Sequence, residues 1–475
     1  PPLPRRGPSR LPAPLPCGRA GVVCQHPAGR ALHRHLTPPP ALQAIQASNP
    51  HAPHLDYLLS IRALLAALEE EEASLTPPFD GWDFNALEAW LEEEGMDLSG
   101  LPVSFAPGLA EGAGVVARRD LAKGDLAVAV PAALTMSTTT ALECPELGTL
   151  VADDPILRAV PSLTLALHLL LEKNAPEGSQ WGPYIASLPP RRALHVPLLF
   201  DSEALQALEG MSVVMDVYRT FVDFIRQFLH CRRWLQYHGV HSPWFTWEEF
   251  SWAAAVVMSR QNALPVECPV YGRSALSLVP LFDLFNHEPG EISSFYDVPS
   301  SAMEVHAKRD FKVGEQVYMS YGARGNDKLL LFSGFVTPGN AHDTVRIPPP
   351  PPPLDEPPRL AKLRGNLLRF SSPAGLSDRE LVKNPPPLCV DARGRPSPAL
   401  AAWATAEALT DEAELTAAIR AAIERRTKGA AGAADEGAAG EGGELPAEAA
   451  ALLLGLVRRQ EGMLGSGGEG GEGAA

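Results

Sequence analysis

The sequence lacks several features that would assign it to a well-defined class of protein. Its six cysteines form no C-x-x-C pair, so we expect neither a disulfide framework nor a bound metal. No apolar run reaches the roughly 18 residues needed to cross a bilayer, since the longest candidate, residues 163–171, is interrupted by His168. We therefore expect a protein of a reducing compartment that has no membrane span and no metal ion.

Positive charge is also scarce. The chain carries 40 Lys and Arg against 56 Asp and Glu, for a formal net charge of -16. Such a balance argues against a protein that binds nucleic acid by neutralising phosphates. The 475 residues with 45% hydrophobic content are enough for two or three cores of ordinary size. The composition predicts a globular protein without a nucleic-acid partner.

The two ends of the chain differ from its middle. Residues 1–55 contain six arginines and no Asp or Glu, which is compatible with a transit peptide, a disordered extension or a wrongly assigned start. Residues 428–443 and 465–475 are rich in Gly, Ala and Glu, and they cannot bury enough apolar surface to order themselves. We predict one short helix, residues 446–460, between them and a disordered tail, residues 465–475.

Helical and strand-like patterns alternate between these ends. Helical spacing of apolar residues predicts helices over residues 54–72, 84–94, 163–173, 202–236, 247–258 and 357–426. Short alternating runs predict strands within 103–131, with a turn at 123–125, and within 276–321. A β region that is split by a helical insert predicts an α+β fold.

Residues 279–335 carry the motifs with the clearest chemistry. Asn286 and His287 end the apolar run PLFDLFNHEPG, and Tyr321 follows GEQVYMS. Taken alone, a buried Asn-His pair usually satisfies neighbouring backbone groups, and a tyrosine at a strand end is usually a core aromatic. The two motifs together indicate two halves of one active site.

The order and spacing of these motifs resemble the SET-domain protein methyltransferases, in particular the Rubisco large-subunit methyltransferase group. Five blocks carry the resemblance: FDG at Phe79, EGAGVVARRDL at Glu111, WGPYIASLP at Trp181, VMSRQNALP at Val257 and YGARGNDKLLLFSGF at Tyr321. The resemblance implies a helical preface (56–100) and a SET domain (101–340) of small twisted sheets with a knot-like crossing. It also implies a helical insert (137–273) and an all-α substrate-binding domain (341–464).

The resemblance implies that the chain uses S-adenosyl-L-methionine. By the family pattern its cofactor-binding residues are Glu111, Gly112, Ala113, Arg260, Asp283, Leu284, Phe285, Asn286, His287, Ser333, Gly334 and Phe335. The glycines of Glu111-Gly112-Ala113-Gly114 let the backbone approach a flat ligand. Short Gly turns are also common at sites that bind no ligand. The Arg260 guanidinium can bind a carboxylate with two parallel hydrogen bonds, although a surface ion pair would also explain it.

Tyr321 is the predicted catalytic residue. Methyl transfer from a sulfonium is an in-line displacement, so the enzyme chiefly aligns the reacting atoms and offers oxygen dipoles to a cationic methyl group. A tyrosine hydroxyl at the end of a narrow channel supplies such a dipole.

Two positions point to histidine rather than lysine as the methyl acceptor. Lysine-directed members carry a Phe two residues after the Ser-Arg pair and a Tyr before the final Gly-Phe, whereas this chain has Asn262 and Ser333. Both changes match the branch that modifies a histidine of actin. An imidazole with a pKa of about 6.5 needs no strong base at neutral pH. If the Asn262 amide oxygen accepts the Nδ1 proton of the target, Nε2 is left with the free lone pair.

Other positions depart from the family or stay ambiguous. Family members carry a cofactor-contacting Arg soon after FDG, whereas this chain has FDGWDF. Phe282 stands where the histidine-directed branch has a Trp that lines the substrate pocket, and Arg324 contacts the substrate peptide or is simply solvated. The six prolines 348–353 form a stiff linker or a polyproline segment that binds an aromatic groove.

Three functions stay open at this point. The first is an actin-histidine methyltransferase, a cytoplasmic monomer. The second is a protein-lysine methyltransferase of the Rubisco or aldolase type, located in the chloroplast if residues 1–55 are a transit peptide. The third is a catalytically inactive SET-fold module that binds a protein.

Overall fold

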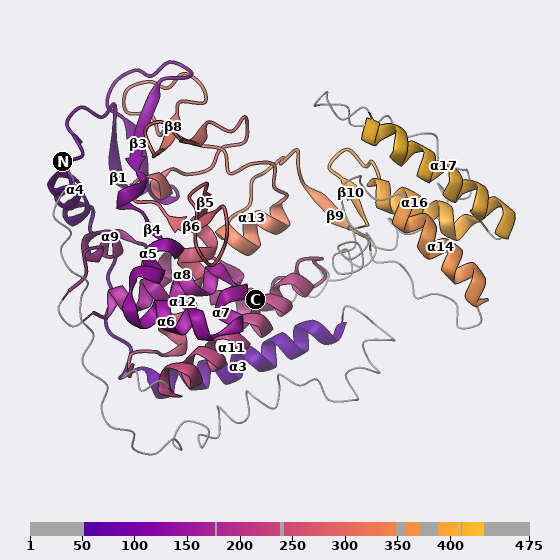
Figure 1. Cartoon of the computed structure of the whole chain (residues 1–475), viewed down its shortest axis with the longest axis horizontal. Coiled ribbons are helices and arrows are strands. Elements are labelled where there is room, and N and C mark those ends of the chain that lie inside the picture. The colour runs from indigo at the N-terminus through magenta and orange to yellow at the C-terminus, as the bar shows by residue number, and fades with distance from the viewer. Residues whose placement is uncertain are drawn as a thin grey trace, which may run out of the picture. The chain divides into compact units, whose positions relative to one another are not determined.

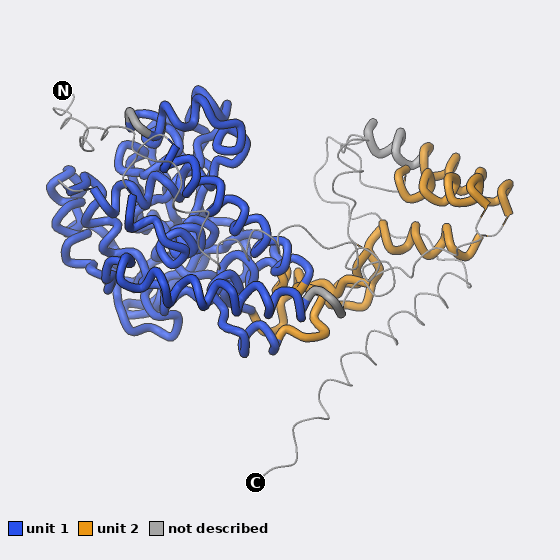
Figure 2. The backbone as a smooth tube through the Cα atoms, turned by 90° about the horizontal axis from the view of Figure 1, so that it is seen from below, with its two compact units in different colours: residues 1–207, 215–324, 328–336 blue, residues 208–214, 325–327, 337–475 orange. Residues whose placement is uncertain are grey.

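The structure is a computed structural model that describes residues 52–175, 178–237, 242–347, 357–370, 388–409 and 411–431 (Figure 1). The chain forms two compact units (Figure 2). Among the described residues, unit 1 comprises those up to 207, 215–324 and 328–336, and unit 2 comprises 208–214, 325–327 and those from 337 onward. The predictions for residues 1–51, the six prolines, the helix at 446–460 and the tail lie outside the described residues.

Unit 1 begins with the two predicted helices, α3 (Ala52–Glu72) and α4 (Phe84–Glu93). Helix α4 starts where the sequence offers a capping residue, because the Asp83 carboxylate accepts a hydrogen bond from the Ala86 amide at 3.0 Å. It buries Leu87, Trp90 and Leu91 and exposes its acidic side chains. The predicted preface is therefore helical.

The β structure of unit 1 is divided among three small antiparallel sheets. One is the hairpin of β1 (Val103–Leu109) and β2 (Gly112–Ala117). The second has the order β3-β8-β7, formed by Leu126–Pro131, Ala302–His306 and Ser294–Asp297. The third has the order β4-β6-β5, formed by Met136–Ser137, Ala275–Leu278 and Asn262–Leu264. Because β3 and β4 pair with strands more than a hundred residues later, the helical insert is closed off as a loop between paired strands.

The insert contains the helices α5 (Thr138–Glu143), α6 (Pro145–Asp153), α7 (Pro155–Ala159), α8 (Pro161–Lys173), α9 (Gly182–Ser187), α10 (Ser202–Gln206), α11 (Val214–Tyr237) and α12 (Trp247–Arg260). Helix α8 is buried on every side from residue 163 to residue 171 and packs against α12, so these two helices form the core of the insert. The prediction of one helical stretch over 202–236 is wrong between α10 and α11. Helix α10 ends at Gln206 with Ala207 as its C-cap, and Gly210 has φ of 79° in the connection, a left-handed conformation that a continuous α-helix does not contain.

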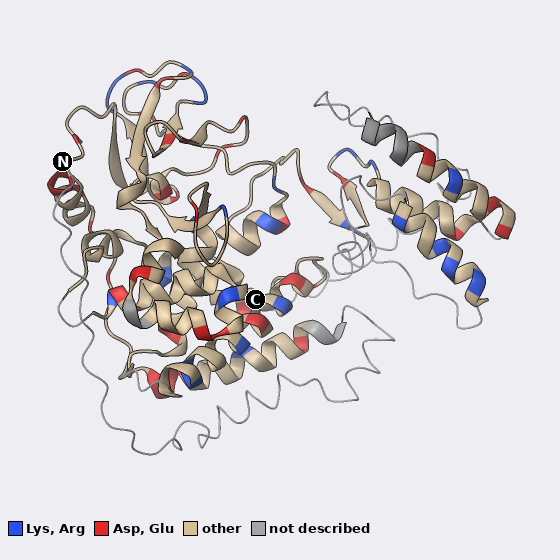
Figure 3. Cartoon of the chain, in the orientation of Figure 1, with Lys and Arg blue, Asp and Glu red and all other residues tan. Residues whose placement is uncertain are grey.

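Unit 2 has its own apolar core. Helix α14 (Pro358–Phe370) packs against α16 (Pro398–Ala408) and α17 (Glu412–Ala431). Basic residues of α14 face acidic residues of its neighbours (Figure 3), with Arg359 3.0 Å from Glu412 and Arg364 3.3 Å from Glu407. The sequence pattern did not anticipate the short hairpin of β9 (Thr344–Arg346) and β10 (Cys389–Asp391).

Two further elements complete the described chain, the 3₁₀ helix η5 (Phe282–Leu284) and helix α13 (Asn326–Ser333). Among the helices that the structure describes, none is long and apolar enough to span a bilayer. No cluster of His, Cys, Asp and Glu in the described ranges could hold a metal ion.

Candidate active site

Backbone hydrogen bonds hold three segments from distant parts of the sequence side by side. The amide of Val317 donates to Val115 of β2 at 2.7 Å, and the amide of Met319 donates to Asn286 at 3.0 Å. Residues 314–319 therefore lie between β2 and residues 286–288. The structure thus joins the two halves of the predicted site to the glycine-containing strand.

A strained turn directs residues 283–287 toward this frame. Leu281 has φ of 65° and ψ of -45°, and the Phe282 amide donates to the Pro280 carbonyl at 2.8 Å. This is a γ-turn with positive φ at its central residue, a rare and strained conformation for a side chain as large as leucine. Leu281 is fully buried, so the surrounding core holds the turn in place.

Tyr321 lies at the centre of the aligned segments. Its hydroxyl donates to the Phe285 carbonyl at 2.8 Å, and its ring lies 5.1 Å from His287 and 6.1 Å from Phe335, measured between centroids. Burial raises the pKa of Tyr321 to about 12. The residue is therefore a neutral phenol near pH 7. Since its hydrogen points at Phe285, its oxygen lone pairs are directed away from that carbonyl.

His287 is fixed in one neutral tautomer. Its Nδ1 accepts a hydrogen bond from the Tyr321 amide at 3.0 Å, so Nδ1 carries no proton. Burial, helped by the cations Lys308 and Arg324, lowers the pKa of His287. The imidazole thus acts as a structural acceptor that sets the position of Tyr321.

Arg260 presents a buried, unsatisfied donor. Its Nε is buried and has no hydrogen-bond partner among the described residues, although the Asp283 carboxylate lies only 3.8 Å away. That carboxylate instead accepts a hydrogen bond from the Tyr184 hydroxyl at 2.7 Å. Because the Arg260 side chain as a whole is 20% exposed, the part of it outside the buried Nε is what a ligand carboxylate would contact.

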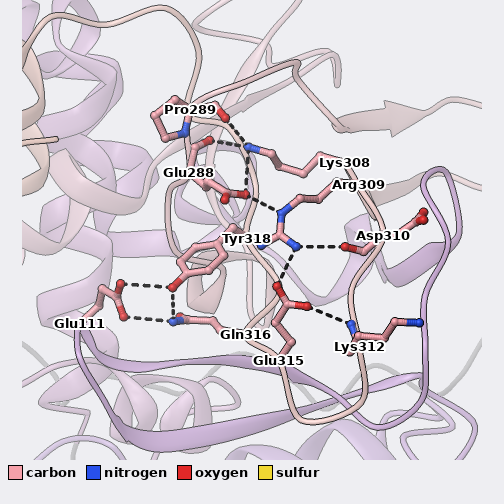
Figure 4. Close-up of polar contacts among 10 residues, drawn as sticks. All are labelled: Glu111, Glu288, Pro289, Lys308, Arg309, Asp310, Lys312, Glu315, Gln316 and Tyr318. Atoms are coloured by element: carbon pink, nitrogen blue, oxygen red, sulfur yellow. Dashed lines mark hydrogen bonds and ion pairs between the residues drawn. The ribbon is translucent and has the colours of Figure 1, made fainter. Parts of the chain in front are cut away.

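Asn286 belongs to a polar network around Gly114. Its amide nitrogen donates to the Ala113 carbonyl and to Gln316 Oε1, each at 2.8 Å, so both amide hydrogens are used and the amide oxygen remains for a ligand. Gln316 also donates to Glu111 at 3.1 Å and to the Tyr318 hydroxyl at 2.6 Å (Figure 4). A Cβ at Gly114 would lie 2.5 Å from Gln316 Oε1 and 2.8 Å from Asn286 Nδ2, so a larger residue would displace the side chains of this network.

A second cluster of charges lies beside this network but has its partners within the chain. Lys308 donates to the carbonyls of Glu288 and Pro289 at 2.8 and 2.5 Å, and Arg309 contacts Glu288 and Glu315 at 3.2 and 2.7 Å (Figure 4). These contacts fasten the loop after residue 287 to the strand-like segment 314–319. The cluster therefore supports the frame of the site.

Asn262 lies two residues beyond Arg260, at the start of β5. Its Nδ2 donates to the Arg260 carbonyl at 2.9 Å. Since a carbonyl can only accept, the amide orientation is fixed and Oδ1 points away from Arg260. Among the described residues, the structure gives Oδ1 no hydrogen-bond donor. The predicted tautomer control needs such an acceptor, and the role of Asn262 stays a prediction.

The remaining predicted residues form the borders of the site or the core behind it. Phe282, Leu284 and Phe285 are buried, so a role for Phe282 in a substrate pocket stays a prediction. Gly334 has φ of 79° and packs so closely on the backbone of His195 that a Cβ would lie 2.7 Å from it, which fixes the adjoining Ser333 and Phe335. Arg324 is exposed, yet it lowers the pKa of His287 and therefore lies near the site.

Sequence reasoning missed Tyr184, Gln316 and Trp82. Tyr184 lay within the recognised block WGPYIASLP, where a polar hydroxyl among apolar neighbours was the available signal. Trp82 has φ of 57°, and a Cβ at Gly112 would lie 3.3 Å from its ring. An indole thus lies against β2 in the block where the expected Arg is missing.

Comparison with known proteins agrees with this geometry. Residues 112–322 match the family model of the SET domain. These residues form a SET domain. The SET domain is similar in fold to two solved structures, the SET domain of LSMT bound to lysine and AdoHcy and Rubisco LSMT bound to AdoMet. Their TM-scores are 0.55 and 0.53, and each is 20% identical in sequence. Each match covers 80% of this chain, and the two matches cover 89% and 88% of the solved chains.

Similar curated proteins are actin-histidine N-methyltransferases. The protein of Canis lupus familiaris is 35% identical over 298 residues, which are 61% of this chain and 49% of that protein. The protein of Mus musculus is 34% identical over 296 residues, or 60% and 48%. The chain therefore spans about half the length of the curated relatives it matches.

Proposed function

We propose that the chain is an S-adenosylmethionine-dependent protein methyltransferase that transfers a methyl group to Nε2 of a histidine, with actin as its substrate. The SET domain and the names of the similar proteins support the first part. The observation that carries the choice of histidine is the fixed Asn262 amide, whose oxygen faces away from Arg260 without a donor among the described residues.

The residues present fit the methyl donor. The partly exposed guanidinium of Arg260 suits the carboxylate of S-adenosylmethionine. The Asn286 amide oxygen, left open because both amide hydrogens are used, suits a donor group of the ligand. The absence of a Cβ at Gly114 lets the Asn286 and Gln316 side chains pack against β2, which holds the Asn286 amide in place. The bound cofactor would supply an electrophilic methyl group on sulfur.

The chain's own residues then align the acceptor. The target imidazole donates its Nδ1–H to the Asn262 amide oxygen, so Nε2 attacks the methyl carbon with its free lone pair. One N–C bond forms, one S–C bond breaks, and the electron pair stays on sulfur. The resulting imidazolium loses its Nδ1 proton to water. The Tyr321 oxygen, whose hydrogen is held by Phe285, would offer its lone pairs to the partial positive charge of a methyl group bound there.

Incubation with labelled cofactor and monomeric actin, followed by peptide mapping in a mass spectrometer, tests this proposal. We expect label on a histidine of actin and S-adenosylhomocysteine as the second product. Label on lysine would favour the second hypothesis of the sequence, a protein-lysine methyltransferase. A protein that binds the cofactor but labels nothing would favour the third, an inactive binding module.

A further inference from the structure

Three side chains form a buried polar triangle behind the predicted cofactor site. The Tyr184 hydroxyl donates to Asp283 Oδ2 at 2.7 Å, and Arg260 Nε lies 3.8 Å from the same oxygen. Tyr184 is 1% exposed and the Asp283 side chain 3% exposed, whereas the Arg260 side chain is 20% exposed. A ligand can therefore reach Arg260, through the part of its side chain outside the buried Nε.

The protonation states of the triangle follow from its burial. Burial and the neighbouring Asp283 carboxylate raise the pKa of Tyr184 well above its ordinary value. Burial also raises the pKa of Asp283, but Arg260 and the hydrogen bond from Tyr184 oppose that rise. Tyr184 thus keeps its proton and donates it, and Asp283 is the acceptor.

The distances show a competition for one carboxylate oxygen. Arg260 Nε has no hydrogen-bond partner among the described residues, and a shift of about 1 Å would bring it within hydrogen-bond distance of Asp283. Oδ2 is instead engaged by Tyr184. The Asp283 carboxylate therefore lies beside the guanidinium as a negative charge, but Nε donates no hydrogen bond to it.

We propose that Tyr184 is a positioning residue that holds the Asp283 carboxylate away from Arg260, so that the guanidinium stays available to the carboxylate of the methyl donor. This inference rests on the proposed function and extends it to a residue outside the predicted cofactor wall. Without the Tyr184 hydroxyl, Asp283 loses its donor and pairs with Arg260. A ligand carboxylate would then meet an occupied donor and a like charge.

Binding of two ligands that differ only at the relevant end tests the inference. S-adenosylhomocysteine carries the amino-acid carboxylate. The ligand 5′-methylthioadenosine has the same adenosine thioether but no carboxylate. By calorimetry, we expect Tyr184→Phe to weaken S-adenosylhomocysteine about tenfold or more and to leave 5′-methylthioadenosine unchanged. Tyr271→Phe is the matched control, because its half-buried hydroxyl donates to Leu157 at 2.8 Å within the helical insert. It should change neither affinity.

The Asp283→Asn background separates positioning from general support of the fold. A neutral amide carries no charge that competes with the ligand carboxylate for Arg260, so adding Tyr184→Phe to Asp283→Asn should leave the ratio of the two affinities unchanged. This comparison also applies if Tyr184→Phe alone fails to fold. The inference would be overturned if Tyr184→Phe weakened the binding of both ligands equally. It would also be overturned if Tyr184→Phe lowered the affinity for S-adenosylhomocysteine by the same factor with and without the Asp283 carboxylate. Either result would leave the proposed function standing. Wild-type protein that binds neither ligand would overturn the proposed function and this inference with it.

Discussion

Removal of the Tyr321 hydroxyl tests whether it acts in catalysis or only in folding. The hydroxyl makes one hydrogen bond, 2.8 Å to the Phe285 carbonyl, and the pKa of about 12 keeps it neutral. Tyr321→Phe retains the ring and its contacts with His287 and Phe335. It removes only the oxygen dipole and the donor to Phe285.

Two losses are expected, and they can be measured separately. A buried carbonyl that loses its donor costs about 1–3 kcal/mol in the free energy of unfolding. Loss of one preorganised polar contact to the charge of a transition state typically lowers kcat by about a hundredfold or more. The affinity for S-adenosylhomocysteine should stay near that of the wild type, because the hydroxyl faces the transferred methyl group.

The assay combines urea unfolding, calorimetry with S-adenosylhomocysteine and single-turnover methyl transfer to actin. Because Tyr321 ionises far above neutral pH, the wild-type rate should show no inflection from it between pH 7 and pH 9. If Tyr321→Phe is destabilised but keeps kcat within about threefold of the wild type, the hydroxyl is structural and the catalytic assignment is refuted.

Three further predictions follow from other parts of unit 1. Asn262→Phe should abolish transfer to histidine without weakening cofactor binding, and full activity toward histidine would remove Asn262 from the mechanism. Gly114→Ala should weaken S-adenosylhomocysteine about tenfold, because its Cβ would lie 2.5 Å from Gln316 Oε1; Gly182→Ala, with nothing within 4 Å of its Cβ, should bind normally. Burial lowers the pKa of His168 to about 3, so below pH about 6.5 the unfolded chain binds a proton that the folded chain excludes. Below that pH this residue should lower the free energy of unfolding by up to about 1.4 kcal/mol per pH unit. Urea titrations at several pH values should show this dependence on pH in the wild type but not in His168→Gln. The same dependence in both proteins would contradict the prediction.

Local patterns predicted the elements of the fold better than their interruptions. Helices α3, α4, α8 and α12 were predictable because apolar side chains recur at helical spacing with clear polar ends. The break between α10 and α11 was not, since α10 ends at Gln206 and no proline or charge run marks the connection before α11.

Side-chain identity and family motifs gave candidate residues, but not their contacts. The motifs around Asn286 and Tyr321 marked the right segments, and the structure shows that backbone pairing through Met319 joins them. The contacts of Gln316 with Asn286 and of Tyr184 with Asp283 were not predictable, because the partners lie 30 and 99 residues apart in the sequence. Tertiary packing alone brings such polar groups together.

The position of the methyl group on the product tests the central claim most directly. Actin methylated by this protein can be hydrolysed to amino acids, and chromatography then separates the two ring isomers of methylhistidine and methyl-lysine. The account predicts Nε2-methylhistidine as the single methylated product, because Asn262 holds the Nδ1 proton. Nδ1-methylhistidine would contradict the role of Asn262, and methyl-lysine would contradict the proposed function itself.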